Sequence, residues 1–118
     1  LMCPGAGMWF GCKDRAEAME AQGITKADIE GLCFPTSFNH DLYQYEPFSS
    51  AEGYTGPVLL IRGTADDLVD DATCHRYESL YGGRCSYKTI EGANHNFASA
   101  SARAALDRLL LKFLTPLK

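Results

Sequence analysis

The segment Gly56-Pro57-Val58-Leu59-Leu60-Ile61-Arg62-Gly63 decides the fold of this chain. Its apolar run is continuous rather than alternating, and a glycine stands at each end. Such a run is typical of a short strand that is covered on both faces of a parallel sheet. We therefore predict a buried strand over 57–62.

The residues that follow predict a regular order of elements. A helix is expected to begin at Asp70 and Asp71, because carboxylates stabilise a helix N-terminus, and to end at Gly82-Gly83. A second strand is expected over 85–90 and a loop over 92–97. Strand, helix and strand with short connections indicate the α/β class with parallel strands and flanking helices.

A last helix is predicted to start near Ser99 or Ser101 and to end before Pro116. It carries one apolar stripe, which is no wider than packing on a sheet requires, so we expect the stripe to lie in the core. The stripe consists of Ala102, Ala105, Leu106, Leu109, Leu110 and Phe113.

Composition excludes several classes of function. The 118 residues carry a net charge of −4 and no stretch rich in Lys and Arg, which disfavours nucleic-acid binding. The apolar runs are too short to span a bilayer, so no membrane partner is predicted. The five cysteines are odd in number, and no two of them have the spacing of metal ligands, so no metal site is predicted. Cysteines spread in this way indicate reduced thiols, so we expect the protein to be cytoplasmic.

The first half of the chain is less regular. Leu1-Met2-Cys3 has the pattern of the last residues of a buried strand, so we expect 1–7 to be a strand end and turn, and the chain to be the C-terminal portion of one longer domain. Asp14 is the predicted N-cap of a helix that ends at Gly23. Thr25 and Asp28 predict a second, short helix that ends at Gly31.

Residues 34–54 are rich in aromatic side chains, prolines and polar residues without a single period. They are predicted to be irregular, and the whole of 8–53 is expected to form a cap-like insertion. Its aromatic side chains either line a pocket for a planar acyl group or pack the cap on the sheet.

Two chemically capable side chains follow the two predicted strands. Asp66 comes after the strand over 57–62, and His95 comes after the strand over 85–90. Because the carboxyl ends of neighbouring parallel strands meet at one edge of a sheet, we expect the two side chains to lie together. A carboxylate that orients an imidazole is one half of a catalytic triad. Asp67 is the rival acid, one residue further along the turn.

The unit over 54–118 resembles the C-terminal part of the α/β-hydrolase superfamily. The acid turn is Gly63-Thr64-Ala65-Asp66-Asp67-Leu68-Val69, and the histidine loop is Gly92-Ala93-Asn94-His95-Asn96-Phe97. The stretch from 54 to 97 is most similar to the cinnamoyl/feruloyl esterase and acylaminoacyl-peptidase-like branch. The resemblance implies that Asp66 and His95 are the catalytic acid and base and that no metal or organic cofactor takes part. Val69 follows the acid closely in the sequence, so we expect it to line the acyl pocket.

The chain departs from that family at one decisive point. No Gly-x-Ser-x-Gly motif occurs, so the nucleophilic serine of the family has no counterpart here. The chain alone is therefore expected to be inactive. Arg62 stands where the family often has His, and Asp70 where a proline is often found.

These observations give one leading prediction and two alternatives. The leading prediction is the Asp and His half of a serine esterase, completed by a missing N-terminal half and acting on a small-molecule ester. The first alternative is a peptidase of the same fold that cuts acyl-peptide or prolyl bonds. The second is a non-catalytic fragment or interaction module.

Overall fold

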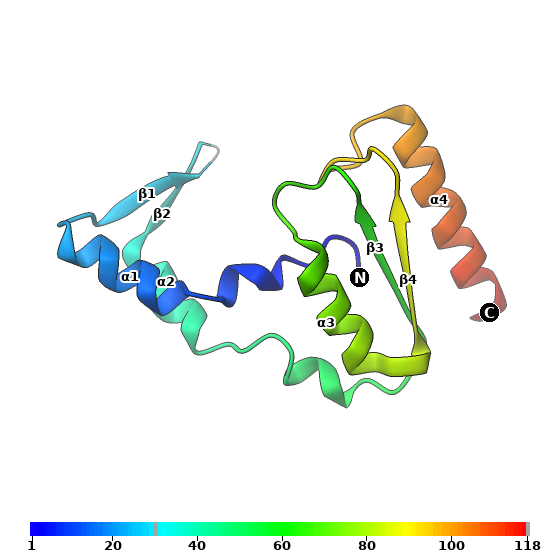
Figure 1. The fold of residues 1–118 in the computed structure, drawn as a ribbon, viewed down its shortest axis with the longest axis horizontal. Coiled ribbons are helices and arrows are strands. Elements are labelled where there is room, and N and C mark those ends of the chain that lie inside the picture. The colour runs from blue at the N-terminus through cyan, green and yellow to red at the C-terminus, as the bar shows by residue number, and fades with distance from the viewer. Residues whose placement is uncertain (30, 118) are drawn as a thin grey trace. The chain divides into compact units, whose positions relative to one another are not determined.

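The computed structural model describes residues 1–29 and 31–117 (Figure 1). It divides into two compact units, one made of residues 1–7 and 52–118, the other of residues 8–51. The first unit contains the acid turn and the histidine loop and is called the sheet unit below. The second is called the helix-hairpin unit. No helix in the described ranges is long and apolar enough to cross a membrane.

The sheet unit is built around β3 (Val58–Gly63), the strand predicted from its apolar run. It pairs in parallel with β4 (Cys85–Ile90), in a register that runs from Val58 opposite Cys85 to Gly63 opposite Ile90. On its other edge, Met2 forms a parallel bridge with Ile61. β3 thus has neighbours on both edges, and its side chains from Val58 to Ile61 are all buried.

The helix α3 (Asp71–Tyr81) joins the two strands (Figure 1). It starts as predicted, since the Asp70 side chain accepts a hydrogen bond of 2.8 Å from the Thr73 amide. It ends at Gly82, which has a φ of 57° that a residue with a Cβ rarely adopts. The short η3 (Gly82–Arg84) then leads into β4. The predicted α/β class with a parallel strand pair is confirmed.

The last helix, α4 (Ala100–Leu114), begins after the predicted cap Ser99, whose hydroxyl accepts a hydrogen bond from the Ala102 amide. The chain then continues into η4 (Thr115–Leu117). The expectation that the apolar stripe of this helix lies in the core is wrong for most of it. Of the six stripe residues, Ala102 is buried and the other five are half-buried, because two strands and a short edge segment offer too little surface to cover them fully.

The helix-hairpin unit corrects three details of the sequence reading. Its first helix, α1 (Cys12–Ala21), starts after Gly11 with φ 66° rather than at Asp14. The predicted helix over 25–31 is an antiparallel hairpin of β1 (Lys26–Ile29) and β2 (Leu32–Pro35). Asp28 accepts a hydrogen bond from the Gly31 amide, so it stabilises the hairpin connection instead of capping a helix.

The third correction concerns the aromatic region. Part of it is the helix α2 (Thr36–Tyr43), which begins after Pro35. Thr36 fixes this helix start, because its hydroxyl and its amide donate hydrogen bonds to the carbonyls of Ile24 and Thr25. The prediction that this region is irregular is therefore wrong over 36–43, where the aromatic side chains do not follow the period of a helix. Two short 3-10 helices connect the two units along the chain. They are η1 (Gly5–Trp9) and η2 (Ser50–Gly53).

Candidate active site

The acid of the site stands on the turn that follows β3. The Asp66 amide bonds with the Gly63 carbonyl at 3.2 Å, which closes the turn. One carboxylate oxygen, Oδ1, accepts hydrogen bonds of 2.9 Å from the Leu68 amide and 3.0 Å from the Val69 amide. The Asp66 side chain is completely buried. The chain thus wraps around this carboxylate and leaves its other oxygen, Oδ2, for a further donor.

The histidine stands on the loop that follows β4. Gly92 turns the chain with a φ of 71°, and Phe97 also has a positive φ, of 49°. Asn94 holds the loop together, because its carbonyl accepts from the Phe97 amide and its side-chain oxygen accepts from the Ala98 amide. His95 therefore projects from a braced loop, with 32% of its side chain exposed.

The turn and the loop are joined directly. The Thr64 amide donates to the Ile90 carbonyl, and the Ala65 amide donates to the Ala93 carbonyl, each at 3.0 Å. The Thr64 hydroxyl oxygen accepts from the Gly92 amide at 2.7 Å. The ends of β3 and β4 consequently hold Asp66 and His95 at a fixed spacing.

Within this frame, the structure brings Asp66 and His95 together. The Asp66 Oδ2 atom lies 3.0 Å from the His95 Nδ1 atom. An ionised carboxylate only accepts hydrogen bonds, so Nδ1 is the donor and the neutral ring leaves a lone pair on Nε2. This arrangement supplies a base at Nε2 that can take a proton and is stabilised when it does so.

The electrostatics of Asp66 suit that role. Burial of the carboxylate acts to raise its pKa, but hydrogen bonds from the Val69 amide, His95, the Leu68 amide and Cys3 outweigh it and lower the pKa to about 2. Asp66 is therefore ionised at neutral pH. The rival Asp67 is exposed.

Acidification is expected to destabilise the protein through Asp66. Its folded pKa of about 2 lies below the ordinary value of 3.8, so its contribution to stability is complete above the ordinary value and is lost as the pH falls through the folded value. The contribution is on the order of 2 kcal/mol, and about half of it should be gone near pH ~3. Urea unfolding at neutral pH and near pH ~3 should show that acidification lowers the free energy of unfolding less in Asp66→Asn than in wild type. The matched variant Asp67→Asn should lose as much unfolding free energy on acidification as wild type does. If Asp66→Asn also lost as much, the loss could not be assigned to Asp66.

Two further residues support the acid turn. The Arg62 guanidinium donates to the carbonyls of Val69 at 2.7 Å and of Asp66 at 3.1 Å, and so clamps the turn against β3. Val69 is buried, and its amide is one of the donors to Asp66. The substrate contact predicted for its side chain stays a prediction.

Cys3 is the neighbour that sequence reasoning missed. Its sulfur lies within 4.8 Å of ligand atoms of both Asp66 and His95, and the residue is buried with a φ of 42°. Burial and the hydrogen bond with Asp66 raise the pKa of its thiol to about 11, so it is not an activated nucleophile. The apolar tripeptide at 1–3 could have indicated this position, because it was expected to be the end of a strand. It lies beside β3 through the bridge between Met2 and Ile61.

The remaining histidine of the sheet unit lies elsewhere. His75 is exposed on α3, where it contacts Asp71 and Glu78. None of the four serines that the structure describes in this unit forms a hydrogen bond with His95; they are Ser79, Ser86, Ser99 and Ser101. The described part of this unit therefore pairs a carboxylate with an imidazole and places no serine hydroxyl on that imidazole.

Comparison with known proteins supports the fold. No protein-family model matches the chain, and no curated protein sequence is similar to it. Among solved structures, the chain is similar to Est1E from Butyrivibrio proteoclasticus with ferulic acid bound, at a TM-score of 0.60 and 16% sequence identity. The match covers 92% of this chain and 56% of that chain, so this chain spans little more than half the length of Est1E. Over the part that the match covers, the chain shares the α/β fold of that structure, with its parallel strands and flanking helices.

Proposed function

We propose that this chain supplies the acid and base of a serine hydrolase that acts on carboxylic esters. The observation that carries the proposal is the contact of 3.0 Å between Asp66 Oδ2 and His95 Nδ1 at the ends of two adjacent parallel strands. The esterase-like fold shared with Est1E supports the same reaction class.

The reaction divides into two half-reactions. A serine hydroxyl attacks the ester carbonyl carbon while His95 Nε2 takes its proton, and the imidazolium then gives that proton to the departing alkoxide. In the second half, His95 takes a proton from water as the water attacks the acyl-serine, and it returns the proton to the serine oxygen. Asp66 stays ionised throughout and orients the ring.

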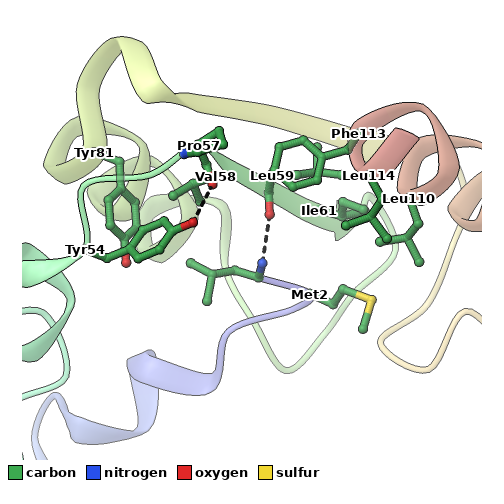
Figure 2. Close-up of a pocket in the computed structure, with 11 residues that line it drawn as sticks. Met2, Tyr54, Pro57, Val58, Leu59, Ile61, Tyr81, Leu110, Phe113 and Leu114 are labelled. Carbon is green, nitrogen blue, oxygen red and sulfur yellow. Dashed lines mark hydrogen bonds between the residues drawn. The ribbon is translucent and has the colours of Figure 1, made fainter. Parts of the chain in front are cut away.

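We further propose that the serine comes from a polypeptide segment that corresponds to the part of Est1E outside the match. A groove of about 310 Å³ in the sheet unit offers that segment a place to pack (Figure 2). Leu59 and Ile61 of β3 line it, together with Tyr54 and the α4 residues Leu110 and Leu114. Leu1, Met2, Tyr54 and Leu114 are each about half exposed at this groove, an arrangement that further chain would cover.

The proposed substrate is an ester with an aromatic acyl group. Est1E has ferulic acid bound, and the resemblance to the cinnamoyl and feruloyl esterase branch points the same way. In this proposal the side chain of Val69, the last residue of the acid turn, lines the acyl pocket. Neither a metal nor an organic cofactor takes part in these steps.

The test compares the chain alone with the chain joined to, or mixed with, the upstream half of its fold. Short-chain aryl esters and acyl-peptide substrates are offered to each preparation, and size-exclusion chromatography reports association. We expect ester hydrolysis only when both halves are present. Selective cleavage of the acyl peptide would indicate the peptidase instead. A stable monomer that neither binds the upstream half nor gains activity would overturn the proposal in favour of a non-catalytic module.

A further inference from the structure

Three metal-ligating groups meet beside the end of β3. They are the Cys3 thiol, the Asp66 carboxylate and the His95 imidazole, and each offers a ligand atom within 4.8 Å of the other two. Cys3 is 8% exposed and Asp66 is 5% exposed, so two of the three groups face the interior. His95 is partly exposed and provides the route by which an ion would enter.

A rearrangement of about one ångström would bring the three groups to the spacing of a tetrahedral zinc site. Bonds of about 2.3 Å to sulfur and about 2.0 Å to nitrogen and oxygen place neighbouring tetrahedral ligands roughly 3.3 to 3.6 Å apart. The Nδ1 and Oδ2 atoms, now 3.0 Å apart, would separate by a few tenths of an ångström, and the imidazole would turn so that Nδ1 faces the ion instead of Oδ2. The sulfur would approach by little more than one ångström at most, since 4.8 Å is the upper limit of the present spacing.

The donor set selects the class of cation. One sulfur, one imidazole nitrogen and one carboxylate oxygen suit Zn²⁺ or Cd²⁺, whereas Mg²⁺ and Ca²⁺ prefer oxygen ligands only. Three protein ligands leave a fourth position for water. We propose that Cys3, Asp66 and His95 form a binding site for a thiophilic divalent cation, with Zn²⁺ as the representative ion.

Binding would change the chemistry of His95. For Nδ1 to bind the cation, the proton that it carries must move to Nε2. The Cys3 thiol releases one proton to solvent as its sulfur binds. With Nε2 protonated and Asp66 engaged by the cation, the imidazole cannot accept a proton from a nucleophile. The cation is therefore an inhibitor, and this consequence rests on the proposed hydrolase function, whereas the binding itself does not.

The test uses Cd²⁺ as the probe on the folded protein, because a cysteine thiolate bound to Cd²⁺ absorbs in the ultraviolet. Titration should give one tight site per chain, which added Zn²⁺ empties. The exposed Cys33 is first replaced by Ser, so that it contributes no signal. In this background, Cys3→Ala should abolish the band of the tight site. His95→Ala should weaken Cd²⁺ binding by at least about a hundredfold, because loss of a direct ligand costs more than loss of an outer-shell partner. The matched variant Cys74→Ala, which removes a different buried thiol, should bind as the parent does.

A band that persists in Cys3→Ala, or an affinity unchanged in His95→Ala, would overturn the site. Circular dichroism establishes that each variant is folded, and His95→Ala decides the question if Cys3→Ala does not fold. A second measurement compares the rate of ester hydrolysis by the complete, two-part protein with and without Zn²⁺. Zn²⁺ should lower the rate of the parent protein, and this inhibition should be lost in Cys3→Ala. Because the optical titration does not use the reaction, failure of the esterase proposal leaves the binding result intact.

Discussion

Replacing His95 by Ala is expected to lower ester turnover by roughly three to six powers of ten in the complete, two-part protein. The variant removes the atom that accepts the nucleophile's proton, while the loop that carries it is held by backbone and Asn94 contacts and should persist. The kcat value is the quantity to measure, because substrate binding does not require the imidazole. The matched control is His75→Ala, which removes an exposed histidine of α3 in the same unit. We expect it to act like wild type.

The companion variant Asp66→Asn should lower kcat by about four powers of ten, since a neutral amide no longer fixes the ring with a proton on Nδ1 or stabilises the imidazolium. Asp67→Asn alters the neighbouring exposed carboxylate and should change kcat by less than about twofold. Near-wild-type turnover in either His95→Ala or Asp66→Asn would remove that residue from the mechanism. Equal losses in Asp66→Asn and Asp67→Asn would show that the charge of the turn matters, rather than the contact with His95.

Replacing Gly63 by Ala is the second change with a large expected effect. A Cβ at this position would lie 2.1 Å from the Ala93 carbonyl oxygen and 2.6 Å from its carbon, and both are backbone atoms. The end of β3 and the histidine loop would have to separate, which breaks the bond between the Ala65 amide and the Ala93 carbonyl. We expect the free energy of unfolding to fall by about 3 kcal/mol, as read from urea denaturation.

The control for Gly63 is Gly83→Ala. A Cβ at Gly83 meets nothing within 4 Å, so this variant should change the free energy of unfolding by less than about 0.5 kcal/mol. Gly63→Ala should also lower the kcat of the complete protein, because Asp66 and His95 are held through the contact that it breaks. A Gly63→Ala variant as stable and as active as Gly83→Ala would mean that the two loops are not tied at this point.

The sheet unit was predictable from sequence because its signals are local. The run over 57–61, the caps Asp70 and Ser99, and the glycines at 82–83 each act within a few residues, and the structure places β3, α3, β4 and α4 accordingly. The approach of Asp66 to His95 follows from the same logic, since adjacent parallel strands end side by side. The catalytic roles of the two residues stay predictions.

The errors fall where local signals compete or where the deciding contact is distant. Asp28 has the spacing of a helix cap but serves a hairpin with Gly31. Thr36 starts α2 through bonds to the carbonyls of residues 24 and 25, which spacing does not reveal. Cys3 reaches Asp66 across more than sixty residues. A search for closely spaced cysteine ligands therefore could not find it.

The number of residues between hydrogen-bonded groups indicates the order in which parts of the sheet unit can fold. The bonds that join the acid turn to the histidine loop connect residues 26 to 29 positions apart, whereas the amino group of Leu1 reaches the Leu59 carbonyl across 58. Closing the shorter loop costs less chain entropy, so β3, α3 and β4 can assemble before the N-terminal segment joins them. We therefore expect Asp66 and His95 to pair at an early stage of folding, and Cys3 to join them later.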